Sequence, residues 1–371
     1  MSDTVRITGY SSRGEGVGRT QDGRVAFVRG AARGDICEIE IIDERQRSCR
    51  ARIVNIIEPS EYRIDPDCPA YPMCGGCDFR HISYEEELQA KLDRVNDALR
   101  RIGATDKKAS QILSTGQTDG YRNKAVFHTE QREGKEVIGF FRAGTHEVYP
   151  VEKCLLLKDE INAKLGKLHS DPGPKDKAIT LRAGTDGHTP VREELDGLVF
   201  QVSGAAFFQV NSDAALLLFR KARRYAALSK DSVLADLYCG VGPLTLFIGR
   251  DAGYAVGVEN DPVAVEDART NAKLNGLDHV DFVLADSGVW EAGRSFRPDC
   301  VTVDPPRKGL STAAVDKILA LSPARIIYIS CDPATFARDI KRLKGYEVQK
   351  LCAVDMFPRT ANVECCALLH A

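Results

Sequence analysis

The pattern of hydrophobic and polar positions divides the chain into three parts. Over residues 1–58, apolar and polar residues alternate in short runs, as at residues 24–28 and 36–42, and glycines separate the runs. A period of two is typical of β-strands that bury one face. We expect a small β-barrel here, because closure of the sheet removes exposed strand edges.

Residues 59–203 combine several patterns. A segment rich in Cys, Pro and Gly at residues 68–81 precedes apolar residues at helical spacing over residues 84–101. We expect this helix to cover the cysteine segment. Short strands with turns follow, for example at residues 137–141, and they predict a central β-rich domain.

Residues 204–371 alternate between strand and helix patterns. The expected strands are residues 233–237, 255–259, 280–284, 300–304 and 325–330, and the expected helices are residues 212–227, 262–275 and 333–343, with another after Gly242. This alternation predicts βαβ units and a mostly parallel, doubly wound sheet, which is an α/β fold of the Rossmann type. Ligands of such sheets bind beyond the carboxyl ends of the strands.

Composition narrows the class of protein. The chain of 371 residues is too long for one ordinary core, and its formal net charge of -2 neither favours nor excludes RNA as a partner. No apolar run approaches the roughly 20 residues that span a bilayer, and the start of the chain is polar. We therefore expect a cytoplasmic protein without membrane contact, and nothing indicates an obligate protein partner. In such a protein, the 12 cysteines favour metal binding or catalysis over disulfides.

Arginine is unevenly distributed. The first 63 residues contain eleven arginines and no lysine. Planar guanidinium groups suit bidentate contacts with phosphate, so this part is a candidate RNA-binding surface. A solvated barrel face, with acidic residues beside the arginines, explains the same composition equally well.

The turn after the first strand of the α/β part is a candidate nucleoside pocket. The segment DLYCGVG at residues 236–242 contains two glycines, and Glu259 ends the next strand 21 residues after Tyr238, where a carboxylate can accept both ribose hydroxyls. The third glycine of a dinucleotide fingerprint is missing, so a nucleoside without phosphate, such as S-adenosylmethionine, fits better. Asp286 ends the third strand, where an adenine amino group can be bound, and Asp304 ends the fourth. Taken singly, helix capping or solvation explains each acid equally well.

Cys331 lies between the end of a predicted strand and the start of the helix at residues 333–343. The helix dipole favours a thiolate at this position, and a thiolate there can attack a bound substrate. An isolated cysteine is more often a buried apolar residue. The position in the fold favours the nucleophile for Cys331, whereas the other cysteines of the α/β part fit the core.

Five motifs follow in order along the α/β part: FFQVN (207–211), DLYCGVG (236–242), VDPPRKG (303–309), SCDPATFARD (330–339) and DMFPRTANVE (355–364). Together they resemble the S-adenosylmethionine-dependent RNA uracil-5 methyltransferases. The resemblance implies a class I methyltransferase fold, with Cys331 as nucleophile and Glu364 as the base that removes a proton. It also implies that S-adenosylmethionine is bound by Gln209, Tyr238, Glu259 and Asp304.

The chemistry requires the same parts. Carbon 5 of uracil is a weak nucleophile, but addition of a thiolate to carbon 6 gives an enolate whose carbon 5 can take a methyl group. A base must then remove the proton on carbon 5 before the thiolate leaves. Members of the family often have Asn in place of Asp332 and His in place of Asn362, so we expect a slightly raised thiol pKa and no proton relay through residue 362.

Cys68, Cys74, Cys77 and the distant Cys154 form a candidate metal site. Four thiolates can hold an iron-sulfur cluster or a structural zinc ion. The family resemblance favours a [4Fe-4S] cluster, with zinc and unliganded thiols as the alternatives. Because methyl transfer is electron-neutral, we expect the cluster to have a structural or RNA-binding role.

The N-terminal barrel bears on the substrate. With its GEGVGR segment at residues 14–19, it resembles the TRAM domain that the ribosomal RNA members carry. Barrel and cysteines together favour 23S ribosomal RNA as the substrate. The alternatives are a tRNA uracil-5 methyltransferase and a non-catalytic RNA-binding iron-sulfur protein. The expected domains are the barrel at 1–58, a central domain with the cysteines at 59–203, and the methyltransferase domain at 204–371.

Overall fold

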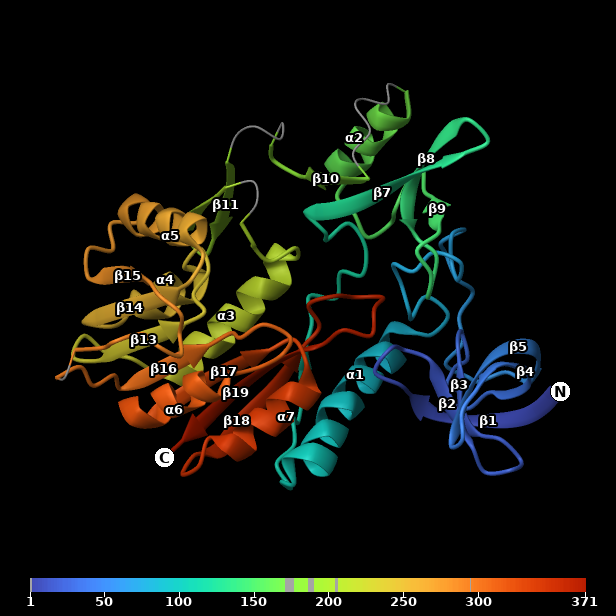
Figure 1. The fold of residues 1–371 in the computed structure, drawn as a ribbon, viewed down its shortest axis with the longest axis horizontal. Helices are drawn as coiled ribbons and strands as arrows, with labels where there is room; N and C mark the ends of the chain where they lie inside the picture. Colours follow the sequence, from blue (N-terminus) through green and yellow to red (C-terminus); the bar gives the residue numbers. More distant parts are fainter. Residues whose placement is uncertain (1, 171–176, 186–189, 204–205, 294) are drawn as a thin grey trace.

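The computed structural model describes residues 2–170, 177–185, 190–203, 206–293 and 295–371. Figure 1 shows a small barrel, a central module and a large α/β unit. No helix in these residues is both long enough and apolar enough to cross a membrane.

The N-terminal strands close into a barrel, as the alternating pattern predicts. Its strand order is β1-β2-β3-β5-β4, with β1 (Ser2–Tyr10), β2 (Gly16–Arg19), β3 (Val25–Val28), β4 (Ile36–Glu44) and β5 (Ser48–Glu58). Val5, Ile39 and Ala51 lie in its apolar interior. Only glycine fits at position 18 without a shift of its neighbours, because a Cβ there would lie 2.2 Å from the Val5 side chain.

The α/β unit is built on an eight-stranded sheet. The strand order is β15-β14-β13-β16-β17-β19-β18-β6, with β13 (Val233–Leu237), β14 (Tyr254–Glu259), β15 (Val280–Leu284), β16 (Cys300–Val303), β17 (Arg325–Ser330), β18 (Glu347–Val354), β19 (Glu364–His370) and β6 (Ile112–Leu113). The strands from β13 to β17 are parallel, and β19 is antiparallel to β17. The chain reverses its winding direction between β13 and β16, which is where ligands of such sheets bind.

Helices cover both faces of this sheet. One apolar core includes α3 (Ser212–Ala226), α4 (Pro243–Gly249) and α5 (Pro262–Leu274), and the other includes α6 (Thr312–Leu321) and α7 (Pro333–Arg342). This is the doubly wound architecture that the sequence predicts.

The helix α1 (Tyr84–Ala98) packs only in part as the sequence suggests. Its residue Val95, together with Leu99 in the following π-helical turn (Leu99–Gly103), joins the apolar core of α6 and α7. Ala90 of α1 also packs with Phe79 at the end of the cysteine segment, so the helix covers that segment in part. The rest of its apolar face packs on the eight-stranded sheet, which offers a larger apolar surface than the cysteine segment. Figure 1 shows α1 lying between α7 and the barrel.

The central module contains a four-stranded antiparallel sheet with one helix. The order is β10-β7-β8-β9, with β10 (Ala178–Arg182), β7 (Lys124–Arg132), β8 (Lys135–Phe141), β9 (Val148–Pro150) and the helix α2 (Asp159–Ser170). A hairpin of β11 (Val191–Leu195) and β12 (Leu198–Val202) follows. Its backbone binds the side-chain amides of Asn271 and Asn275 on α5, which attaches the hairpin to the α/β unit.

Candidate active site

The predicted nucleoside-binding residues lie at the carboxyl ends of neighbouring strands. Tyr238 follows β13 with a positive φ of 66°, and Gly242 begins α4 with a φ of 85°. Glu259 at the end of β14 accepts hydrogen bonds from three backbone N–H groups, those of Gly240 (3.0 Å), Asn260 (2.8 Å) and Asp261 (3.0 Å). These bonds fix the Glu259 carboxylate at the edge of the glycine turn, where a carboxylate is suited to ribose hydroxyls.

Other polar groups stabilise the same edge. Asp236, fully buried in β13, accepts from the hydroxyls of Thr245 (2.5 Å) and Thr302, and burial raises its pKa to about 6. Asp286 accepts from the backbone N–H of Gly288 at 2.8 Å and so closes the turn after β15. The buried Gln209 lies before α3, and its carbonyl accepts a hydrogen bond of 3.2 Å from Asn123 of the central module.

The structure brings Cys331 and Glu364 together. Cys331 follows β17, and Glu364 begins the antiparallel neighbour β19, where it is buried. Their charges interact with each other and with those of Asp304 and Arg307 from the loop after β16. Arg307 belongs to the VDPPRKG motif, but no feature of the sequence predicts a role for it.

Burial and charge set the protonation of this group. Burial, then the charges of Glu364 and Asp304, raise the pKa of the Cys331 thiol to about 11, whereas Arg307 lowers it. Asp332 raises it too, as the sequence suggests, with the smallest effect of these groups. Burial and the neighbouring acids therefore outweigh the expected stabilisation of the thiolate by the helix dipole. Burial also raises the pKa values of Asp304 and Glu364.

Asp332 has a structural explanation. It is the N-cap of α7, and its carboxylate accepts hydrogen bonds from the backbone N–H groups of Ala334 (2.9 Å) and Thr335 (2.8 Å). An Asn side chain has an oxygen at the same place, so either residue can begin this helix. The nearest cation is Arg94 of α1, at 3.8 Å.

The loop after β16 is fastened to α7. The buried carboxylate of Asp339 accepts from the backbone N–H of Leu310 at 2.7 Å and from the Tyr328 hydroxyl at 2.8 Å. Arg338 donates to the Lys308 carbonyl at 2.7 Å. These contacts fix the loop that carries Arg307 beside Cys331.

The tail segment 355–363, which leads into Glu364, is held from several sides. The backbone N–H of Arg359 donates to Glu87 of α1 at 2.7 Å, and the Tyr121 hydroxyl donates to the Pro358 carbonyl at 3.0 Å. Asp78, the residue after Cys77, accepts from the backbone N–H of Ala361 at 2.9 Å. The tail segment thus joins the cysteine segment, the central module and α1 directly before the candidate base.

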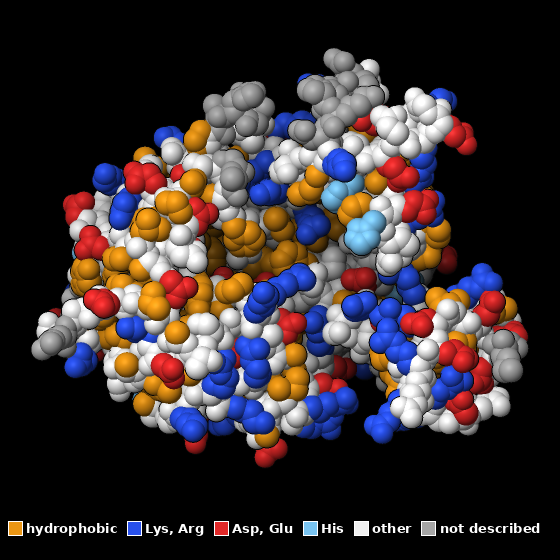
Figure 2. All heavy atoms as spheres, viewed as in Figure 1, with side chains coloured by type: hydrophobic (Ala, Val, Ile, Leu, Met, Phe, Trp, Pro, Cys, Tyr) orange, Lys and Arg blue, Asp and Glu red, His pale blue; other side chains and the backbone are white. Residues whose placement is uncertain are grey.

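Cys331 opens into a cleft of about 900 Å³ between the barrel and the catalytic unit. Five arginines line the cleft. They come from the barrel, from α1 and from the loop after β16, and are Arg13, Arg29, Arg50, Arg94 and Arg307. Figure 2 shows Lys and Arg side chains in blue along both sides of the gap between barrel and catalytic unit. Guanidinium groups on both walls suit a polyanionic strand that reaches the thiol.

The four cysteines of the candidate metal site also come together. Cys68, Cys74, Cys77 and Cys154 are free thiols, and all four line one cavity of about 70 Å³. Arg80 braces this segment through ion pairs with Asp67 (2.6 Å) and Asp119 (2.5 Å). Among the described residues, no three His, Cys, Asp or Glu side chains are placed to hold a single metal ion. The donor set suits a cluster with several metal atoms, since each thiolate can then bind a different iron.

Comparison with known proteins agrees with this geometry. A family model described as tRNA (Uracil-5-)-methyltransferase matches residues 191–371, and a TRAM domain model matches residues 4–54. An RNA methyltransferase of Bacillus cereus is 31% identical to the chain, over 96% of the chain and 94% of the relative. One of Clostridium tetani is also 31% identical, over 98% of the chain and 95% of the relative.

One solved structure shares the entire architecture. It is the tRNA (uracil-54, C5)-methyltransferase of Pyrococcus abyssi in complex with S-adenosyl-L-homocysteine, with a TM-score of 0.78 and 22% identity over 100% of both chains. This likeness establishes the class I methyltransferase fold with an N-terminal TRAM barrel. The chain is an enzyme that belongs to the S-adenosylmethionine-dependent RNA uracil-5 methyltransferase family.

Proposed function

We propose that this enzyme methylates carbon 5 of a uridine in 23S ribosomal RNA through a covalent adduct between Cys331 and the uracil. The observation that carries the proposal is the meeting of Cys331 and Glu364 at the wall of a cleft lined by arginines. S-adenosylmethionine supplies an electrophilic methyl group. We assign its binding to Gln209, which lies before α3, and to the residues at the strand ends, which are Tyr238, Glu259, Asp286 and Asp304.

The Cys331 thiol first loses its proton to water. The thiolate then bonds to carbon 6 and moves the electron pair of the ring double bond toward oxygen 4. Carbon 5 then bonds to the methyl group, whose bond to sulfur breaks. The carboxylate of Glu364 takes the proton from carbon 5. The carbon–sulfur bond to Cys331 breaks as the double bond re-forms, which releases 5-methyluridine and the thiolate.

The electrostatics of the site suit these roles. The raised pKa of Glu364 makes its carboxylate a stronger base than an exposed one, which favours proton removal from carbon. The raised pKa of Cys331 keeps the thiol protonated in the free enzyme and makes the thiolate a stronger nucleophile once formed. A positive sulfonium beside Asp304 would offset the acidic charges that oppose thiolate formation.

RNA containing 5-fluorouridine tests the adduct, because fluorine at carbon 5 cannot be removed as a proton. With S-adenosylmethionine present, we expect a stable protein-RNA complex attached at Cys331, and Cys331→Ala should form none. On ordinary RNA, Glu364→Gln should accumulate the adduct. A wild-type enzyme that methylates RNA without any trapped adduct would contradict the mechanism, and one that binds RNA without methylating it would support a non-catalytic role.

A tRNA substrate is the second candidate. The Pyrococcus abyssi tRNA enzyme matches the chain over its whole length, so the overall architecture, barrel included, does not favour ribosomal RNA by itself. Methylation of purified 23S ribosomal RNA and of tRNA, measured side by side with labelled methyl donor, separates the two. Label in 23S RNA alone supports the first choice, and label in tRNA alone excludes it.

We further propose that Cys68, Cys74, Cys77 and Cys154 hold a [4Fe-4S] cluster. The support is the convergence of four free thiols on one cavity. The protein purified without oxygen should contain four iron and four sulfide per chain, as this cluster type requires, and Cys77→Ser should lose them. Stoichiometric zinc in place of iron would contradict the assignment.

A further inference from the structure

The four-stranded sheet of the central module has two different faces. The helix α2 covers one of them, where Phe127, Ile138 and Leu181 pack with Ile161 and Leu165. Because side chains alternate along a strand, the neighbouring residues point to the opposite face. That face, which we call the open face, carries Lys124, Val126 and His128 of β7, Phe141 of β8 and Arg182 of β10.

Arg182 is the unusual residue of the open face. Its side chain is buried, with 6% of its surface exposed, yet its Nε, Nη1 and Nη2 atoms have no hydrogen-bond partner within the described part of the chain. A buried guanidinium without a partner is costly, and native proteins rarely keep one without a ligand or another use. Lys124 is its direct cross-strand neighbour, so a second positive charge faces it instead of an acid.

The nearest acid does not neutralise Arg182. Glu193 acts on it only through its charge, and its carboxylate is already engaged by the Asn123 amide at 3.2 Å and the Ser212 hydroxyl at 3.1 Å. Within the residues that the structure describes, neither Arg182 nor Lys124 forms an ion pair. The Arg182 guanidinium nitrogens are closed off from solvent in the free protein, so a phosphate reaches them only if the side chain turns toward Lys124. With that movement, two adjacent cations, one of them unpartnered before binding, are the arrangement that an oxyanion from outside the chain would complete.

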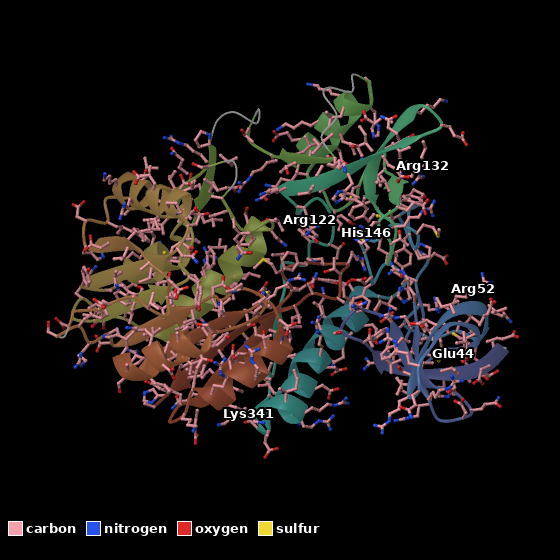
Figure 3. The ribbon with its side chains drawn as sticks, in the orientation of Figure 1. Glu44, Arg52, Arg122, Arg132, His146 and Lys341 are labelled. Atoms are coloured by element: carbon pink, nitrogen blue, oxygen red, sulfur yellow. The ribbon has the colours of Figure 1, made fainter. Side chains whose placement is uncertain are left out.

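The open face extends from this pair toward the catalytic cleft. At one end, Asn123 donates hydrogen bonds to the carbonyls of Gln209 and Val210, at 3.2 and 2.9 Å. Lys124 therefore lies beside the segment that contains Gln209, which we assign to methyl-donor binding. At the other end, the residues after Phe141, Ala143 and Gly144, line the same cleft as Cys331. In Figure 3 the labelled His146 and Arg122 lie on the wall above this hollow, and Figure 2 shows pale-blue histidine side chains at its edge.

Aromatic rings occupy the cleft end of the open face. The rings of His128 and Phe141 are stacked with centroids 3.8 Å apart, and His146 meets Phe141 edge-on at 5.3 Å. Val126 between these rings and Lys124 is 42% exposed. Flat rings beside exposed apolar surface are the usual means of holding an unpaired base.

We propose that the open face binds the RNA strand next to the target uridine, with Arg182 and Lys124 holding a backbone phosphate and the His128–Phe141 stack holding a neighbouring base. This inference rests on the proposed function, since it supplies the contacts that keep the uridine unstacked at Cys331. It predicts an unpaired RNA segment as the ligand, because a duplex buries its bases.

Arg182→Met tests the phosphate contact. The change removes an unsatisfied charge from a buried position, so thermal stability should stay the same or rise, whereas affinity for RNA should fall about tenfold. We would measure both with the full-length Cys331→Ala protein and purified 23S ribosomal RNA, tRNA and single-stranded oligouridylate. A plot of log affinity against log salt concentration has a negative slope, and the slope should become shallower by about 0.7 for the lost phosphate contact.

Arg132→Met is the matched control. Arg132 lies on the same strand and the same face, but it is paired with Glu130 at 2.9 Å and Glu147 at 3.3 Å. This variant should bind RNA like the parent. For the stack, His128→Ala should weaken binding about fivefold or more, and His128→Phe, which keeps a ring, should restore it.

The outcomes that overturn the inference are distinct from those that overturn the proposed function. If Arg182→Met weakens calorimetric binding of S-adenosylhomocysteine and leaves RNA affinity unchanged, the oxyanion is the carboxylate of the methyl donor. If RNA affinity is unchanged and stability falls, Arg182 is structural. Binding is measured without turnover. If the variants change RNA affinity as expected but the wild-type protein methylates no RNA, only the proposed function is contradicted.

Discussion

Two buried cations of this protein have opposite environments. Lys91 of α1 donates to Glu87 at 2.6 Å, to Asp355 at 2.6 Å and to the Phe357 carbonyl at 3.1 Å, so its charge is satisfied inside the chain. Arg182 in the central module has no such partner among the residues that the structure describes. The first cation stabilises a segment that must keep one shape, and we propose that the second is completed only when RNA binds.

The same difference distinguishes two regions of the protein, the surroundings of the tail segment and the open face. Around Lys91, the tail segment that leads into Glu364 is fixed by contacts from α1, the cysteine segment and the central module. Fixed geometry suits a base that must reach one proton. The open face instead keeps half-buried rings and, among the described residues, a buried guanidinium without a partner. These features cost stability in the free protein, and we propose that they serve to bind an RNA strand.

The largest expected effect is at Lys91. Lys91→Met should lower the free energy of unfolding by about 3–5 kcal/mol, because it leaves Asp355 buried without its cation and Glu87 with only the more distant Arg359, at 3.7 Å. Urea denaturation measures the loss, and the triple variant with Glu87→Gln and Asp355→Asn should recover much of it. Arg182→Met should not lower stability. Equal losses of stability in Lys91→Met and Arg182→Met would show that the two cations do not differ as described.

The next effect is at Asp78. Asp78→Ala removes the acceptor for the Ala361 N–H and should cost about 1–3 kcal/mol of stability, while Asp78→Asn retains an acceptor and should cost less. Because the same bond precedes Glu364, the Ala variant should also accumulate the Cys331 adduct on ordinary RNA. Normal adduct turnover in a folded Ala variant would show that the tail segment does not depend on this contact.

A smaller effect concerns the thiol. With a Cys331 pKa of about 11, alkylation of the free enzyme should rise about tenfold per pH unit from pH 8 toward pH 11, since only the thiolate reacts. Arg307→Met removes the cation that lowers this pKa and should slow alkylation at any pH in this range. Peptide mapping by mass spectrometry follows residue 331 separately from the other cysteines. A plateau near pH 8 would contradict the raised pKa.

The smallest effect is expected at Asp332. Asp332→Asn keeps an oxygen for the N-cap of α7 but removes one negative charge near the thiol. Alkylation of Cys331 should become slightly faster, and the melting temperature should change little. A large loss of stability would mean that the charge, and its contact with Arg94, matters more to this helix than the cap.

The sequence by itself determined the helices and strands and the motifs that carry the reacting residues. The alternating pattern predicts the barrel and the strands that carry Tyr238, Glu259 and Asp304, because a strand or helix pattern depends on neighbouring residues alone. The motifs likewise predict Cys331 beside a helix start, and the fold places it there.

Only the tertiary structure decided which residues are buried, paired or left without a partner. Arg182 stands in an ordinary strand sequence, and nothing near it predicts a buried guanidinium. The packing of α1 on the catalytic sheet, the network around Lys91 and the raised pKa of Cys331 all arise from residues far apart in the chain. Burial and charge pairing are properties of long-range contacts, so a local pattern carries no record of them.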